Sequence, residues 1–517
     1  MKRPVGVPKS SVLQDLPRQV ASFRLWELSS VVGEGALELI VNLAVLVLVE
    51  RRYGQSALGI YSYLLSFYHL TAYLAEFGIP RYVERETALH SESPSDQTQV
   101  LNNAYQAVLT LALLAGSLCF LSAAYDTSHT QIQEKVAAYF IIGVAIPFRN
   151  LNRVRLASLN GQGRHEEAAK LQAKKRIVFL GAIFTLLTVK IAPTYFEIAP
   201  SYLVTSFLMS EVYLALAGRR RLQLPSLCSV WAGLDRLRAT LREGYRLTFT
   251  DDPLEVVLYI DLLVLGIFMS AWDLGVYAEA SILARFFLLI PMSLRPIFRR
   301  KYCVLIAHAD PPQASRLARQ AAARLFFLHA LLALAMLLFY PQILHLVFRT
   351  GGEESLSFQI FKVFVPGILF SASVITSEPL YEALGQVDAL RKLMLTVFAV
   401  NLVLNVYLIP LAGLFGAASA TMISMLLHFL LLGEHSSQPY RLQKGSYLVA
   451  GSAVYVIYAV MQALDAGMMV AVWLLPLLLS LLFYCIGFFN ADKRLEVQPS
   501  DGGRTDGGRT EGNLTAV

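Results

Sequence analysis

The sequence predicts an all-α polytopic membrane protein with about fourteen transmembrane helices, and three observations carry this prediction. Residues of the AVILMFWYC set form 56% of the 517 residues and charged residues only 16%, whereas about 25% of a usual soluble domain is charged. Apolar stretches long enough to cross about 30 Å of hydrocarbon recur along the chain. Lysines and arginines are concentrated in alternate loops between these stretches.

The apolar stretches are each about 17–25 residues long, the length that a membrane-spanning helix needs. Boundaries predicted in this way are good to a few residues. The predicted spans are 25–49, 56–79, 103–125, 133–152, 176–194, 198–217, 247–270, 274–298, 325–348, 358–383, 391–410, 413–433, 446–464 and 467–489.

The distribution of basic residues predicts the orientation, because cytoplasmic loops carry an excess of lysine and arginine. Nearly all of the 44 basic residues flank the spans on the side that holds both chain ends. Both termini are therefore predicted to be cytoplasmic, with an even number of helices. The loops on the other side are short, and the basic residues there are Arg51, Arg52, Lys135, Lys190 and Arg349.

Two short matches recur at nearly one spacing and predict an internal repeat. Leu58-Gly59-Ile60-Tyr61 at the second span resembles Leu274-Gly275-Val276-Tyr277 at the eighth, and Gly161-Gln162 after the fourth resembles Gly385-Gln386 after the tenth. Each match links a span to the one six later, so the two copies have the same orientation. We therefore expect two parallel six-helix lobes plus two C-terminal helices, an arrangement in which transporters commonly place the substrate path between the halves.

These patterns divide the chain into six segments. They are a basic cytoplasmic N-tail (1–23), an N-terminal six-helix lobe (24–220), a basic cytoplasmic linker (221–246), a C-terminal six-helix lobe (247–434), the last two helices (445–490) and a Gly-rich cytoplasmic tail that we expect to be disordered (491–517).

Several classes of function receive no support. The four cysteines lie far apart without a C-x-x-C motif, so neither a metal site nor a disulfide framework is predicted. No P-loop, paired-histidine or G-x-S-x-G motif occurs, so no cofactor and no catalytic site is expected. The net charge of +7 comes from short loops between apolar spans, which indicates membrane lipids rather than nucleic acid as the surroundings.

Three stretches resemble the polysaccharide-exporter branch, the Wzx-type flippases, of the multidrug/oligosaccharidyl-lipid/polysaccharide (MOP) superfamily. Residues 49–88 have an L-G-x-Y entry to the second span and then F-G-I before an R-E pair. Residues 259–280 resemble the family's I-D-x-x-x-L-G-x-F segment followed by V-G-x-Y. The most specific stretch, 382–424, contains G-Q and then I-P-x-x-G-x-x-G-A-A-x-A-T-x-I-S.

The resemblance implies a V-shaped bundle of two lobes in the cell membrane. It also implies movement of an undecaprenyl-pyrophosphate-linked oligosaccharide from the inner to the outer leaflet, for surface polysaccharides such as the O-antigen of lipopolysaccharide. A pyrophosphate needs cations in its path, because guanidinium groups bind phosphate oxygens in a bidentate manner. The candidates for substrate binding are Arg285, the deepest arginine in the chain, and Arg24 and Arg149, which lie closest to the apolar spans.

Acidic residues inside spans are costly and usually face the bundle interior or a water-filled cavity. Glu27, Glu34 and Glu38 follow one stripe of the first helix, which predicts an acidic face that binds H⁺ or Na⁺ or that orients cavity arginines. Asp261 and Glu279 are further candidates for ion coupling. The alternatives are helix packing for the acids and neutralisation of a first- or seventh-helix acid for Arg285.

Prolines and asparagines add predictions about local structure. Pro253 should break the seventh helix and free backbone carbonyls, and Pro379 should kink the tenth. Asn401 and Asn405, one turn apart, are expected to hydrogen-bond between helices.

Three other functions compete with the flipping of a lipid-linked glycan. A MATE-like, cation-coupled exporter of small amphipathic compounds would also suit the acidic stripe. A glycan polymerase or ligase should have a large outer loop, which this sequence lacks. A membrane scaffold without transport activity would not need charges inside both halves.

Overall fold

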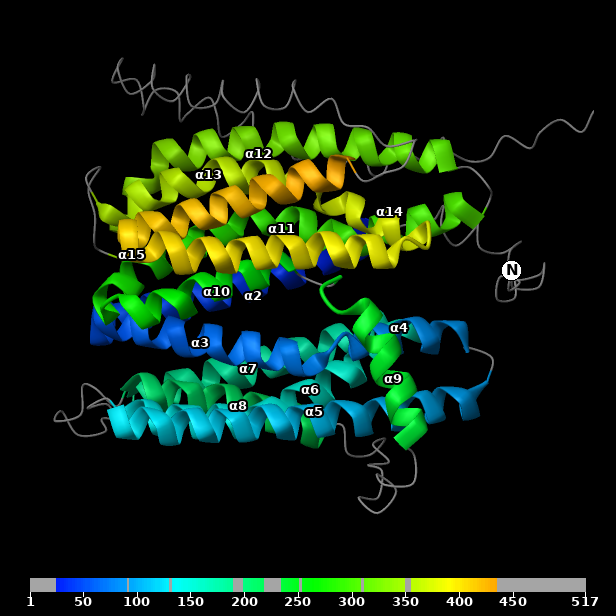
Figure 1. Cartoon of the computed structure of the whole chain (residues 1–517), viewed down its shortest axis with the longest axis horizontal. Helices are drawn as coiled ribbons and strands as arrows, with labels where there is room; N and C mark the ends of the chain where they lie inside the picture. Colours follow the sequence, from blue (N-terminus) through cyan, green and yellow to red (C-terminus); the bar gives the residue numbers. More distant parts are fainter. Residues whose placement is uncertain are drawn as a thin grey trace, which may run out of the picture.

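The computed structural model describes residues 25–90, 93–129, 133–188, 199–217, 234–250, 253–307, 311–348 and 355–434, and all the regular elements in these ranges are helices (Figure 1). The predicted tails, the two last spans (446–464 and 467–489) and Arg24 lie outside the described residues. The backbone of the first helix is described, but the side chains of Glu27, Glu34 and Glu38 lie outside the described part.

The helices of the N-terminal half are α2 (Leu25–Tyr53), α3 (Gln55–Glu76), α4 (Ile79–Leu89), α5 (Pro94–His129), α6 (Gln133–Gly161), α7 (His165–Thr188) and α8 (Ala199–Ala217). Those of the second half are α9 (Leu234–Leu247), α10 (Pro253–Phe268), α11 (Ala271–Ala307), α12 (Pro311–Phe348), α13 (Leu356–Val374), the 3₁₀ turn η4 (Ile375–Ser377), α14 (Glu378–Ala383) and α15 (Val387–Glu434).

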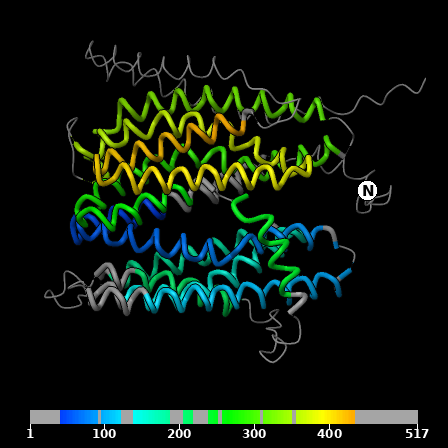
Figure 2. Tube along the Cα trace, viewed as in Figure 1, coloured from blue at the N-terminus to red at the C-terminus, as the bar shows by residue number. Residues whose placement is uncertain are grey.

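The helices run nearly parallel in two layers. Figure 1 shows α3 and α5–α8 in the lower layer and α10–α15 in the upper one, with α2 behind α10. Helix α9 crosses between the layers at the right-hand end, beside α4, and this end is called the basic end below. The other end, where α3 and α11 begin, is called the opposite end; Figure 2 shows the blue and green traces meeting there.

Each of the first twelve predicted spans overlaps a described helix. The eleventh and twelfth both lie in α15, which Gly413 divides with a φ of 57°, a backbone conformation that glycine adopts readily. The number of membrane crossings and their orientation stay predictions. Among the described residues, five helices have the length and apolarity to cross a membrane: Ser95–Leu121, Ala271–Ile306, Pro311–Phe348, Leu356–Ala383 and Val387–Leu432.

Two prolines set helix boundaries. The predicted seventh span began at 247, but α10 begins at Pro253, a position where the missing N–H costs nothing. As predicted, this break frees a carbonyl: that of Thr250, which accepts a hydrogen bond from Arg295 of α11. The predicted kink of the tenth helix is also present, because the 3₁₀ turn η4 separates α13 from α14, in whose first turn Pro379 lies.

The two copies of the L-G-x-Y repeat meet at the opposite end. A Cβ added to Gly59 of α3 would lie 1.9 Å from the carbonyl oxygen of Ala271, and one added to Gly275 of α11 would lie 2.2 Å from that of Gln55. Real Cβ atoms do not approach other atoms so closely, so the two backbones touch only because both positions are glycine. The repeated segment is therefore the place where α3 of one layer packs against α11 of the other.

Candidate functional site

A stacked pair of rings joins the two layers near the middle of the molecule. The rings of His69 on α3 and Tyr259 on α10 are parallel within 3°, with centroids 4.9 Å apart. The guanidinium of Arg285 on α11 lies over the Tyr259 ring, 4.6 Å from its centroid. Cation–π contacts of this kind hold a guanidinium loosely by comparison with a carboxylate partner.

Arg285 differs from the other basic residues of this region because its described contact is with an aromatic ring and not with a carboxylate. Its Nε is buried without a hydrogen-bond partner. Among the side chains that the structure describes, no carboxylate forms an ion pair with it, and Asp261 of the seventh span is held by other residues. The structure therefore gives no support, within its described part, to neutralisation of Asp261 by Arg285. A guanidinium in this state can still take an anionic ligand.

The other cations around His69 are already paired. Arg149, Arg285, Lys175 and Arg153 all lie within electrostatic reach of the His69 ring. Arg149 on α6 donates to Oε1 of Glu76 at 2.6 Å, and Arg153 lies 3.5 Å from the same oxygen. Glu76, at the end of α3, thus balances two arginines, and Arg149 is less available to a ligand than Arg285 is.

A second buried carboxylate organises the N-terminal layer. Glu211 on α8 forms an ion pair with Lys175 of α7. It also accepts hydrogen bonds from Asn152 at 2.8 Å and from the hydroxyl of Tyr68 at 3.3 Å. Residues on α3, α6, α7 and α8 therefore converge on one acid, which fixes the helices that carry the cations around His69.

Asp261 lies at the centre of a separate, fully buried cluster in the other layer. Its Oδ2 accepts hydrogen bonds from the Tyr277 hydroxyl of α11 at 2.8 Å and from the Thr421 hydroxyl of α15. Its Oδ1 accepts from the amides of Asn405 at 2.7 Å and Asn401 at 3.3 Å. The asparagines do bond between helices as predicted, with Asp261 as their partner.

The two asparagines leave their carbonyl oxygens without hydrogen-bond partners. Oδ1 of Asn401 and Oδ1 of Asn405 are both buried and unpaired. The two ends of an amide are distinguished only by their hydrogen bonds. If both side-chain amides were flipped, their carbonyl oxygens would face the carboxylate of Asp261. A cation bound between them would then have oxygen ligands from two helices, α10 and α15.

The structure does not bring Glu279 together with Arg285 or Asp261. Glu279 is buried on α11, close to Gln55 at the start of α3 and to Ser357 on α13, and its Oε1 has no hydrogen-bond partner. These residues lie toward the opposite end. Of the predicted site residues with described side chains, Arg285 and Arg149 thus share the centre, whereas Asp261 and Glu279 occupy two other places.

Sequence reasoning missed five residues of the centre: His69, Tyr259, Glu76, Lys175 and Glu211. The rule that singled out Asp261, an acid inside an apolar span, would also have found Glu211. No comparable signal exists for His69 and Tyr259, because polar aromatic residues are common in the spans.

Comparisons with known proteins agree with this architecture. The sequence profile described as polysaccharide biosynthesis protein matches residues 31–300, more than half of the chain. The probable flippase AglR of Haloferax volcanii is 24% identical over 416 residues, which cover 77% of this chain and 80% of that protein.

Solved structures share the fold at low sequence identity. An inward-facing multidrug resistance MATE family transporter of the MOP superfamily superposes with a TM-score of 0.59 at 12% identity, covering 82% of this chain and 99% of that one. The lipid II flippase MurJ, in an inward closed conformation, has a TM-score of 0.56 at 13% identity, with 84% and 97% covered. The chain, a multi-pass membrane protein with the MOP transporter fold, belongs to the polysaccharide biosynthesis protein family.

Proposed function

We propose that this protein flips an undecaprenyl-pyrophosphate-linked oligosaccharide from the inner to the outer leaflet of the cell membrane. The observation that carries the proposal is Arg285, a guanidinium at the contact of the two layers that has a ring beneath it and, in the described part, no carboxylate partner. The match to the polysaccharide biosynthesis family and the similarity to a probable flippase support the same class of substrate.

The charge of the centre favours an anionic substrate. Glu76 and Glu211 hold Arg149, Arg153 and Lys175 in place, so a pyrophosphate that binds Arg285 enters a region whose other cations are already positioned. Phosphate accepts bidentate hydrogen bonds from arginine. A MATE-like, cation-coupled exporter of small amphipathic compounds is the weaker alternative, because a compound of this kind with a positive charge would meet Arg285 at the same place.

The Asp261 cluster is the proposed coupling site for H⁺ or Na⁺. The oxygen ligands it can offer to a cation are a carboxylate, two hydroxyls and, if the two asparagine amides are flipped, two carbonyl oxygens. Hard cations prefer oxygen ligands of this kind. The cluster joins α10, α11 and both parts of α15. A cation or proton on Asp261 would change how these helices pack, which is how ion binding can bias the arrangement of one lobe.

The test is flipping of an undecaprenyl-pyrophosphate-linked sugar in proteoliposomes, with and without imposed Na⁺ and pH gradients. Asp261→Asn should lose the response to the effective gradient while it still inserts into the membrane. Asp96→Asn, the same chemical change at an exposed position of α5, is the matched control and should respond as the wild type does.

Three results would separate the parts of the proposal. Absence of flipping by the wild-type protein would contradict the substrate. Flipping that ignores both gradients would leave the substrate standing and exclude ion coupling. An Asp261→Asn variant that responds normally would move the coupling site elsewhere, with the first-helix acids Glu27, Glu34 and Glu38 as the next candidates.

A further inference from the structure

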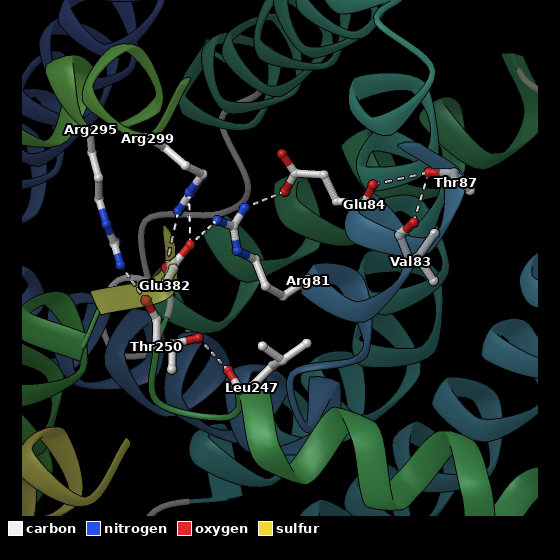
Figure 3. A network of polar contacts seen from close by, with 9 residues as sticks. All are labelled: Arg81, Val83, Glu84, Thr87, Leu247, Thr250, Arg295, Arg299 and Glu382. Carbon is white, nitrogen blue, oxygen red and sulfur yellow. Dashed lines mark hydrogen bonds and ion pairs between the residues drawn. The ribbon is translucent and has the colours of Figure 1, made fainter. Parts of the chain in front are cut away.

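At the basic end, one carboxylate joins two arginines that come from different layers. Glu382 on α14 accepts a hydrogen bond from Arg81 on α4 at 2.8 Å and another from Nε of Arg299 on α11 at 2.9 Å, both through Oε2 (Figure 3). Arg81 and Glu382 are 301 positions apart in the sequence. This contact is therefore a direct ionic link between the two lobes.

The link is more protected than the nearby ion pair between the linker helix α9 and the C-terminal lobe. The side chains of Arg81, Glu382 and Arg299 are 10%, 14% and 19% exposed. By comparison, the ion pair between Arg246 of α9 and Asp388 of α15 has side chains that are 52% and 51% exposed. Solvent weakens exposed ion pairs far more than shielded ones, so the Glu382 contact should contribute most of the ionic attraction between the lobes here.

The environment of Arg81 offers an internal comparison. Arg81 also pairs with Glu84, one turn along the same helix α4, at 2.5 Å. Figure 3 shows Glu84 on the side of Arg81 away from Glu382. The two acids thus contact the same guanidinium, but only Glu382 connects it to the other lobe.

The convergence of Arg81 and Arg299 on one carboxylate is an anion site made by both lobes. We propose that Glu382 is the resting occupant of this site and that it holds the basic end closed. The pyrophosphate of an arriving substrate then replaces Glu382 as the anion that is bound to Arg81 and Arg299. A pyrophosphate carries more charge than a carboxylate and has two phosphoryl groups, so it binds two guanidiniums at a greater separation. The exchange therefore lets the lobes move apart at this end while the substrate is held.

This inference rests on the proposed function for the identity of the anion, but the closed contact itself does not. It assigns Arg81 and Arg299 as the first substrate contacts and Arg285, deeper in the molecule, as a later one. Glu382 acts on substrate through these arginines and is a positioning residue.

The test measures the width of the basic end by spin-label distance measurements in nanodiscs. Labels are placed on cysteines that replace two exposed residues away from the contact, Gln99 of α5 and Lys392 of α15, after the four natural cysteines have been replaced by alanine. Glu382→Gln should shift the main distance to longer values without any ligand. The matched control is Glu84→Gln, which removes an acid from the same arginine within one helix and should leave the distance unchanged.

The same labelled protein tests the exchange with a short-chain prenyl pyrophosphate as the probe and the corresponding prenyl alcohol as its control. The pyrophosphate should shift the wild-type distance toward that of Glu382→Gln and should leave the distance in the variant unchanged. The alcohol should change the distance in neither protein. An unshifted Glu382→Gln would overturn the closing role. A wild-type protein that ignores the pyrophosphate would overturn the exchange. Loss of flipping with a normal distance response would instead count against the proposed function.

Discussion

At the scale of single residues, the partners of a charge decide what it can do. Arg149 and Arg285 are both arginines inside predicted spans, yet Arg149 is held by Glu76 and Arg285 by an aromatic ring. Exchanging a cation–π contact for a charge-assisted hydrogen bond to phosphate is favourable. Separating Arg149 from Glu76 instead leaves this buried acid with only the longer contact to Arg153, at 3.5 Å. Arg285 is therefore the better candidate for contact with the substrate.

Replacing Arg285 should reduce flipping more than it reduces protein level in the membrane. A hydrogen bond to a charged group contributes about 1.5–3 kcal/mol, so Arg285→Ala should lower the flipping rate by about tenfold to a hundredfold. Arg285→Lys should restore only part of the flipping rate, because lysine keeps the positive charge but lacks the planar guanidinium that binds phosphate in a bidentate manner. The measurement is the flipping rate in proteoliposomes at equal protein content, with Arg316→Ala, at an exposed position of α12, as the control. A normal rate for Arg285→Ala would move phosphate recognition to Arg149 or Arg24.

The sequence could identify Asp261, Arg285, Asn401 and Asn405 as unusual, because a polar side chain inside an apolar span costs free energy unless it has a polar partner. It could not pair them, since pairing depends on how the helices pack. Asp261 and Asn405 come into contact across 144 positions of chain, and nothing local to either residue encodes this contact.

At the scale of helices, apolar length predicted where helices lie, and proline and glycine set how they begin, bend and touch. The predicted span at 247–270 began before α10, because Leu247 and Phe249 were joined to the apolar run that follows Pro253. Gly59 and Gly275 were recognised as members of a repeat. Their contact with each other could be seen only in the folded chain.

Filling the glycine contact should favour separation of α3 from α11. In Gly59→Val, the added side chain would overlap the Ala271 carbonyl, and overpacking of this kind costs about 1–3 kcal/mol. A cysteine in place of the buried Ser62, one turn further along α3, should then react faster with an impermeant maleimide than it does with Gly59 present.

The control for this experiment is Gly181→Val on α7, where an added Cβ would meet nothing within 4 Å. It should leave the reactivity of the cysteine at position 62 unchanged. Equal reactivity in the Gly59→Val and Gly181→Val backgrounds would show that the glycine contact does not hold this end closed.

At the scale of the whole molecule, the all-helical fold class followed from composition and span length, whereas the division into two six-helix lobes is a prediction from a repeat of only a few residues. Orientation rests on basic residues alone, because neither the helices nor their packing distinguishes inside from outside. It therefore needs an experiment of its own.

The predicted orientation can be tested with single cysteines and an impermeant thiol reagent on intact cells. Cysteines at Trp272 and Leu411, both exposed near the opposite end, should react from outside. Cysteines at Glu166, in the first turn of α7, and at Gln320, in the first third of α12, replace exposed residues and should react only after the membrane is opened. Labelling of position 166 in intact cells would reverse the orientation.

The contact between Gly59 and Gly275 has a mechanical consequence for the far end of α11. Arg299 lies 24 positions beyond Gly275 on the same helix, which corresponds to about 36 Å at 1.5 Å per residue. With the glycine contact as a fulcrum, a tilt of about 10° would swing this lever arm by about 6 Å at Arg299, given that length. A displacement of this size is twice the 2.9 Å that separates Arg299 from Glu382. A small rocking motion, with no unfolding of any helix, is thus sufficient to open the molecule.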